Sequence, residues 1–372
     1  MNAKVQSVNK KVVYINGYFT KEHINGVPRY ATEIVKRLDK YFMPGEAVLV
    51  VPKGAKNIPK LKNICVCKWE DRGRKRENKS VLWGEITYRN YISKKNGLNI
   101  NFTNRGEKYS NSITTLHDLI MLDKYNFAFD LTLKQKVKYE LHEIVDKFWM
   151  YHKLSIKKKY ALKLVTVSET SRYIISQKLH IPIEKIYVIG NGWEHILEIE
   201  SKDEQVDSRI HKGQFYFSIG NMKAHKNFQW ILKEARILQR EIFVIAGKIP
   251  DNIAEAVRCD LPNVILLGHI SDEYMKFLLE NSKGLIFPSL NEGFGIPPIE
   301  ALALGAPVIV SDIPVMHEIF EDSVGYFNPY KNYDNLEQIF EMANRESIKK
   351  VLKKHSWEIE SKKWFQLINE NR

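Results

Sequence analysis

Short apolar runs alternate with segments of helical period along most of the chain. From Gln214 onward, runs of β-branched or aromatic residues are followed by segments in which apolar positions recur at helical spacing. We expect strands at Phe215–Ile219, Ile242–Ala246, Val264–Leu267, Gly284–Phe287 and Val308–Val310, and helices starting near Asn227, Asp251, Ser271 and Pro297. Alternation of this kind is typical of a doubly wound parallel sheet.

The first half of the chain repeats the pattern less regularly. We expect strands at Val12–Ile15, Ala47–Val51, Ile113–Leu116, Leu164–Val167 and Ile186–Ile189, and helices after Val27, before Asn90, around Leu133–Tyr151 and after Ser168. The fold class is therefore α/β, with two doubly wound domains that face each other across a ligand cleft.

Domain boundaries follow from a polar stretch without apolar period. Residues 198–213 are charged and fit an interdomain linker. The expected domains are residues 1–197 and 214–355. The amphipathic segment 356–372 is expected to pack back on the first domain.

Composition narrows the class of protein. The chain has 372 residues, and no stretch of about eighteen apolar residues or apolar leader is visible, so we expect a soluble protein in the cytoplasm. Three cysteines occur, at Cys65, Cys67 and Cys259, the first two within an alternating run that predicts a strand. Their number and spacing favour reduced packing cysteines and disfavour a metal site or a disulfide.

The net charge of +13 indicates a polyanionic partner: nucleic acid, anionic lipid or a phosphorylated substrate. The chain has no recognised nucleic-acid reader motif, so no specific nucleic acid is expected. Segment 131–164 combines lysines, including 157–159, with aromatic residues. It suggests a peripheral position on an anionic membrane surface, at the inner face of the plasma membrane. The alternative is that its aromatics are core and its lysines solvated.

The most informative stretch runs from Pro288 to Pro307. Gly293 and Gly295 permit close approach of backbone to a ligand, and Pro297 or Pro298 begins a short helix whose free N–H groups suit a phosphate. Gly305 is expected to end this helix.

Glu292 in the loop and Glu300, expected in the first turn of the helix, can both reach the mouth of this site. Carboxylates accept hydrogen bonds from hydroxyls, so the pair suits a sugar and a ribose. The alternative is that Glu300 is an N-terminal capping charge and the glycines form a turn.

A second loop, Gly220–Asn227, follows the strand Phe215–Ile219. Asn227 is placed to cap the next helix, and Lys226 could hold a diphosphate as a point charge. A solvated surface lysine is the alternative for Lys226.

These stretches together resemble the family 4 retaining glycosyltransferases. Residues 292–300 resemble the family's E-x7-E region, and Gly220–Asn227 resembles its G-x-x-x-x-R-K-N loop. Further segments that match in the family's order are 26–30, 115–119, 166–172, 190–192 and 267–271.

The resemblance implies the GT-B fold, two facing Rossmann-like domains, with a nucleotide-diphosphate sugar as donor substrate and no metal or other cofactor. Glu292 would bond the transferred sugar, Glu300 the ribose and Lys226 the diphosphate, with His117 beside the donor sugar. The implied catalytic residues are His117, Glu292 and Lys226. The implied donor-binding residues are Gly26, His225, Lys226, Ile270, Gly293, Phe294, Gly295, Ile296 and Glu300. Arg29, Asp118 and Arg172 are expected on the acceptor or phosphate side.

One position departs from the family pattern. His225 stands where the family has an arginine, so diphosphate binding is expected to be weaker, or completed by Lys223, Lys248 or Arg172.

The implied reaction retains anomeric configuration by same-face attack. The expected donor is GDP-mannose or a dTDP- or UDP-sugar, and the acceptor a glycan or undecaprenyl-linked saccharide in bacterial capsule, exopolysaccharide or O-antigen synthesis, as in mannosyl- and rhamnosyltransferases. Three alternatives stay open: a sugar-nucleotide epimerase on the same fold, a basic nucleic-acid-binding protein, and a non-catalytic sugar-binding relative.

Overall fold

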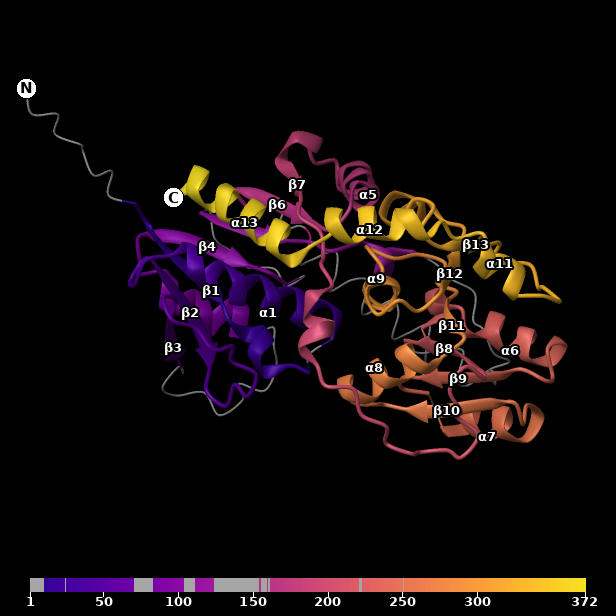
Figure 1. Cartoon of the computed structure of the whole chain (residues 1–372). Helices are drawn as coiled ribbons and strands as arrows, with labels where there is room; N and C mark the ends of the chain where they lie inside the picture. Colours follow the sequence, from indigo (N-terminus) through magenta and orange to yellow (C-terminus); the bar gives the residue numbers. More distant parts are fainter. Residues whose placement is uncertain are drawn as a thin grey trace, which may run out of the picture.

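The computed structural model describes residues 10–23, 25–69, 83–103, 111–123, 154, 159, 161–220, 223–249 and 251–372. The helix expected around Leu133–Tyr151, and most of the lysine-rich and aromatic segment 131–164, lie outside these residues. The described chain forms two parallel sheets, each with its own helices, that lie next to each other (Figure 1).

The first sheet has seven strands in the order β3-β2-β1-β4-β5-β6-β7. Its strands are β1 (Val12–Asn16), β2 (Ala47–Pro52), β3 (Cys65–Trp69), β4 (Gly97–Asn101), β5 (Ser112–Thr115), β6 (Lys163–Thr166) and β7 (Ile186–Val188). Its α-helices are α1 (Gly26–Leu38), α3 (Arg89–Ile92) and α5 (Glu169–Leu179). We call these elements the first domain.

The second sheet has six strands in the order β10-β9-β8-β11-β12-β13. Its strands are β8 (Phe215–Ile219), β9 (Ile242–Ala246), β10 (Val264–Gly268), β11 (Gly284–Phe287), β12 (Val308–Ser311) and β13 (Gly325–Phe327). Its helices are α6 (Phe228–Ile237), α7 (Asp251–Asp260), α8 (Asp272–Asn281), α9 (Ile296–Ala303), α10 (Pro314–Phe320), α11 (Glu337–Glu341) and α12 (Arg345–Lys354). We call these elements the second domain.

Two strands have no counterpart among the expected ones. The strand β4 lies in the middle of the first sheet, between β1 and β5, yet its sequence is Gly-Leu-Asn-Ile-Asn. Asn99 and Asn101 are buried there, and Asn101 Oδ1 accepts hydrogen bonds from the backbone N–H and the hydroxyl of Thr103. The two buried asparagines interrupt the apolar run that would otherwise predict a strand from the sequence. The other strand, β13, is only three residues long.

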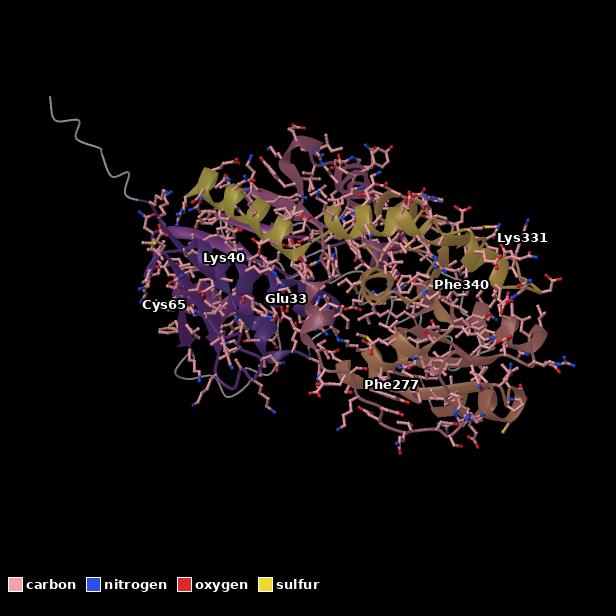
Figure 2. All side chains as sticks on the ribbon, viewed as in Figure 1. Glu33, Lys40, Cys65, Phe277, Lys331 and Phe340 are labelled. Carbon is pink, nitrogen blue, oxygen red and sulfur yellow. The ribbon has the colours of Figure 1, made fainter. Side chains whose placement is uncertain are left out.

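The expectation of packing cysteines is wrong for two of the three. Cys65 and Cys259 are exposed and Cys67 is partly exposed. Cys65 lies on β3, the edge strand of the first sheet (Figure 2). The strand was predicted, but its edge position leaves its alternating side chains largely in solvent.

The last helix, α13 (Trp357–Asn371), packs on α1 of the first domain (Figure 1). Trp364 Nε1 donates a hydrogen bond of 2.7 Å to the hydroxyl of Tyr30, and both side chains are fully buried. At the rim, the ring of Phe365 stacks on Tyr41 at 5.0 Å. The chain therefore passes through the second domain and returns to complete the core of the first.

The start of α13, where the chain returns to the first domain, is bound to the short connection that follows β7. The carboxylate of Glu194 accepts hydrogen bonds from Ser356 Oγ (2.5 Å) and from the backbone N–H of Trp357 (2.9 Å). Burial raises the pKa of Glu194, but these hydrogen bonds outweigh it and lower the pKa overall. Gly192 lies directly against this start of α13.

No helix among the described residues is long and apolar enough to cross a membrane.

We predict that Gly192→Ala destabilises the protein by at least about 2 kcal/mol. A Cβ at Gly192 would lie 2.1 Å from Trp357 N and 2.7 Å from the carbonyl carbon of Ser356, so backbone must move. Urea unfolding measures the change. Gly26→Ala is the control, because a Cβ at Gly26 meets no atom within 4 Å and should shift stability by less than about 1 kcal/mol. Equal unfolding midpoints for the two variants would contradict the prediction.

Candidate functional site

The loop 288–295 joins the buried strand β11 to helix α9 and faces the first domain. Gly295 adopts a left-handed conformation (φ +103°) that starts the helix, and Gly305 (φ +77°) follows its end, as predicted. A Cβ added at Gly293 would lie 3.3 Å from Asp118 Oδ2 and from the carbonyl oxygen of His117. The loop thus lies close against the first-domain segment that follows β5.

Glu292 and Lys226 come together at this point. Lys226 belongs to the turn η7 (Ala224–Lys226) after β8, and its Nζ lies 2.5 Å from Glu292 Oε1. The side chains are 19% and 11% exposed, so the ion pair is largely shielded from water. The carbonyl of His225 accepts a hydrogen bond of 2.7 Å from the backbone N–H of Leu290, which ties the two loops together.

His225 and Asn227 flank Lys226. Burial, with the positive charge of Lys226, lowers the pKa of His225 to about 4, so this side chain is neutral at pH 7. Asn227 does not cap α6 through its side chain, contrary to the prediction. It lies in the left-handed region (φ 51°) and donates Nδ2 to the carbonyl of Pro329 at 3.1 Å instead. Of the other lysines named for the diphosphate, Lys223 precedes η7 and Lys248 is exposed after β9.

His117 is buried beneath the loop. Its Nε2 lies 3.0 Å from the carbonyl oxygen of Phe102, which indicates that the ring proton is on Nε2. The edge of its ring meets Tyr30, with ring centroids 4.9 Å apart.

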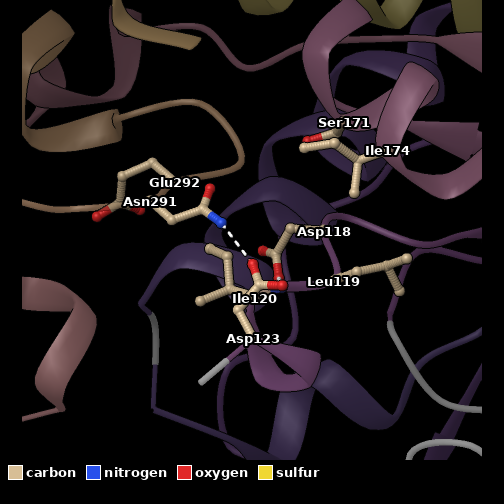
Figure 3. A pocket seen from close by; sticks show the side chains of 8 residues that line it. All are labelled: Asp118, Leu119, Ile120, Asp123, Ser171, Ile174, Asn291 and Glu292. Atoms are coloured by element: carbon tan, nitrogen blue, oxygen red, sulfur yellow. Dashed lines mark hydrogen bonds between the residues drawn. The ribbon is translucent and has the colours of Figure 1, made fainter. Parts of the chain in front are cut away.

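Asp118 follows His117 and lies at a small hollow between the domains. Asp118, Asn291 and Glu292 line the hollow, and Asn291 Nδ2 donates across it to Asp123 Oδ2 at 2.8 Å (Figure 3). Burial raises the pKa of Asp118 to about 6, and the charge of Glu292 adds to the rise. Two carboxylates from opposite domains therefore border one space.

Glu300 lies deeper than expected. It is the fifth residue of α9, not a first-turn residue, and is only 3% exposed. Its Oε1 lies 2.6 Å from His195 Nε2. The other predicted residues of this segment are Phe294, buried with its ring edge-on to His355 at 5.3 Å, and Ile296, the first residue of α9.

The remaining predicted residues do not join Glu292 and Lys226 directly. Arg29 Nη2 pairs with Asp272 Oδ2 of the second domain at 2.5 Å. Arg172 is engaged within the first domain, with Glu169 and the carbonyl of Ile183. Gly26 is the first residue of α1, and a Cβ added to it would meet no atom within 4 Å. Ile270 follows β10, is partly buried and packs against the hydrophobic core.

Sequence reasoning missed several groups that join the domains. Glu318 of α10 accepts hydrogen bonds from the backbone N–H groups of Glu169 and Thr170 (2.6 and 2.7 Å), so it caps α5 of the opposite domain. Asp272 and His195 were missed as well. Their partners lie 243 and 105 residues away in the chain, so no local pattern identifies them.

Among the described residues, no group of three or more His, Cys, Asp or Glu side chains could hold a metal ion.

Comparison with known proteins gives a family match for the second domain. Residues 200–356 match the family model described as glycosyl transferases group 1. The second domain is a group 1 glycosyltransferase domain. The resemblance to glycosyltransferases is thereby confirmed, and the glycosyltransferase domain contains both Lys226 and Glu292.

Two curated relatives are O-antigen mannosyltransferases. The chain is 30% identical to the O-antigen chain mannosyltransferase RfbU of Salmonella typhimurium, over 50% of this chain and 52% of that protein. It therefore spans about half the length of that relative. It is 24% identical to the O-antigen chain mannosyltransferase B of Escherichia coli, over 82% of this chain and 83% of that protein.

A solved structure shares the whole fold. A sucrose-phosphate synthase from Thermosynechococcus elongatus superposes with a TM-score of 0.65 over 97% of this chain and 99% of that chain, at 15% identity. The expected GT-B arrangement, with the glycosyltransferase domain facing a second α/β domain, is confirmed.

We predict that Asp118→Asn changes the pH dependence of stability. With a folded-state pKa of about 6 against the usual 3.8, wild-type Asp118 keeps a proton that the unfolded chain releases between about pH 4 and 6. Wild-type stability therefore falls as pH rises through this window, and the variant lacks this fall. Urea unfolding from pH 4.5 to 7.5 should show the variant gaining stability relative to wild type up to about pH 6, then a plateau. A pH-independent difference between the variant and wild type would contradict the prediction.

Proposed function

We propose that this chain transfers a hexose or deoxyhexose from a nucleoside-diphosphate sugar to a glycan or lipid-linked saccharide, with retention of anomeric configuration. The observation that carries the proposal is the shielded ion pair between Lys226 and Glu292, in front of the N-terminus of α9 within the glycosyltransferase domain. A cation suits a diphosphate and a carboxylate suits sugar hydroxyls.

The ion pair also suggests how the site receives its donor. Lys226 and Glu292 form an ion pair in which the two charges neutralise each other. A diphosphate that binds Lys226 replaces the carboxylate as its partner and releases Glu292 to accept hydrogen bonds from the sugar. The positive charge then stays close to the leaving group during transfer.

The reaction proceeds by attack on the face from which the diphosphate departs. The bond between the anomeric carbon and the phosphate oxygen breaks, and the acceptor oxygen bonds to that carbon on the same face. The acceptor proton passes to the departing phosphate oxygen. Lys226 and the backbone N–H groups of Gly295 and Ile296 stabilise the negative charge that develops there, since Pro297 and Pro298 of α9 have no N–H.

The remaining residues take supporting positions in this proposal. His117, buried against Tyr30 and Phe102, forms the floor beside the transferred sugar. Asp118, at the hollow between the domains, faces the acceptor. Glu300 binds the ribose.

The two O-antigen mannosyltransferase relatives support GDP-mannose as the first donor to test, ahead of dTDP- and UDP-sugars. They also support a saccharide of a bacterial surface polysaccharide as the acceptor class, and we propose that this saccharide is linked to an undecaprenyl lipid. A panel of nucleotide sugars, each with and without acceptor, tests the proposal. Conversion of a donor without acceptor would favour a sugar-nucleotide epimerase instead.

We predict that Glu292→Gln and Glu300→Gln each lower kcat/KM for transfer by at least about tenfold, because each removes a charged hydrogen-bond acceptor from a shielded site. Glu300→Gln should act mainly on donor KM. Steady-state kinetics measure both. Glu234→Gln is the matched control, a buried carboxylate of α6 that bonds to Asn332 and to the backbone of Tyr333. If all three folded variants transfer at the wild-type rate, the site is assigned wrongly.

We also predict that transfer continues in excess chelator, because Lys226 and the backbone N–H groups of Gly295 and Ile296 stabilise the diphosphate charge. The measurement is the initial rate with the best donor before and after treatment with EDTA. Loss of activity that magnesium or manganese restores would refute the prediction.

A further inference from the structure

A buried chain of three side chains lies behind Glu300. His195 sits in the turn η6 (Glu194–Glu198), where the backbone leaves the first domain, and is only 2% exposed. Its Nδ1 lies 2.8 Å from Trp357 Nε1, and its Nε2 lies 2.6 Å from Glu300 Oε1. The three residues come from the connection between domains, the last helix and the glycosyltransferase domain.

Hydrogen-bond chemistry fixes the direction of this chain. An indole N–H can only donate, so His195 Nδ1 must accept from Trp357. The ring proton is therefore on Nε2 and is donated to Glu300. Trp357 thus selects one tautomer of His195, and that tautomer holds one oxygen of the carboxylate in place.

The second oxygen of Glu300 is differently placed. Within the part of the chain that the structure describes, Oε2 has no hydrogen-bond partner, and the side chain keeps 4% of its surface accessible. Oε2 is not sealed from solvent, so a ligand hydroxyl can reach it and donate a hydrogen bond to it. His195 therefore holds Oε1 of Glu300, and Oε2 is available to accept a hydrogen bond from a ligand.

We propose that His195 and Trp357 are positioning residues that fix Glu300 so that its second oxygen accepts a hydrogen bond from the ribose of the donor nucleotide. This inference rests on the proposed function. Trp357 is fully buried at the start of α13, so the orientation of the carboxylate depends on how this helix sits at the junction of the domains. A site assembled within the glycosyltransferase domain alone would lack this dependence.

The test compares recognition of ribose in matched variants. Isothermal titration measures binding of the nucleoside diphosphate of the best donor and of its 2′,3′-dideoxy counterpart. Wild type should prefer the ribose form by about tenfold or more, since a buried acceptor loses its partner in the dideoxy form. His195→Phe should reduce this preference to near one, with little change in affinity for the dideoxy form. It should also raise donor KM more than it lowers kcat.

Two further variants separate positioning from packing. His195→Gln can donate one amide N–H to Glu300 and should restore part of the preference. Trp357→Phe should lose part of it, because the tautomer is no longer selected. Trp364→Phe is the matched control: it removes another fully buried indole hydrogen bond of the same helix, to Tyr30, and should keep the wild-type preference.

Failure of the proposed function and failure of this inference alone would give different results. If wild type binds no nucleoside diphosphate, the proposed function and this inference both fall. If wild type binds but His195→Phe and Trp357→Phe keep its preference for ribose, or wild type has none, only the inference falls. If circular dichroism shows that His195→Phe is unfolded, the preference for ribose is measured in His195→Gln and Trp357→Phe instead. An equal preference for ribose in Trp357→Phe and Trp364→Phe would then overturn the inference.

Discussion

A carboxylate that leaves water requires a hydrogen-bond donor, and the junction between the two domains is built around this requirement. Glu300 takes its donor from His195 of the connection, and Glu318 takes two backbone donors from the start of α5. Glu360 of α13 accepts from the backbone N–H of Gly190 at 2.8 Å. Each acid belongs to one element and accepts a hydrogen bond from another, so these bonds tie the elements of the junction together.

Charges are also paired at the residues that we propose to bind the substrate. Lys226 pairs with Glu292, and Arg29 pairs with Asp272 across the domains. In the proposed function, the cations that suit an anionic donor therefore have carboxylate partners that its diphosphate must replace. A diphosphate carries more negative charge than one carboxylate, which favours this exchange.

The sequence predicted the repeating elements well because their signal is local. Strands β8 and β9 were predicted to the residue, and the glycines around α9 identified the loop that carries Glu292. Prediction from the sequence failed where contacts with residues distant in the chain determine the local structure. The central strand β4 is hidden by asparagines that find buried partners, and Asn227 bonds to Pro329 rather than to its own helix. The depth of Glu300 depends on His195, which no local pattern pairs with it.

The position of α13 determines when the protein can finish folding. Tyr30 and Phe102 of the first domain lie against Trp364, which the ribosome adds only after the whole glycosyltransferase domain. During synthesis, part of the core of the first domain therefore stays exposed until α13 has been made, although domains made first usually fold first. The first domain can therefore complete its core only once α13 has been made, and a nascent chain stalled before Trp357 would present aromatic surface to chaperones.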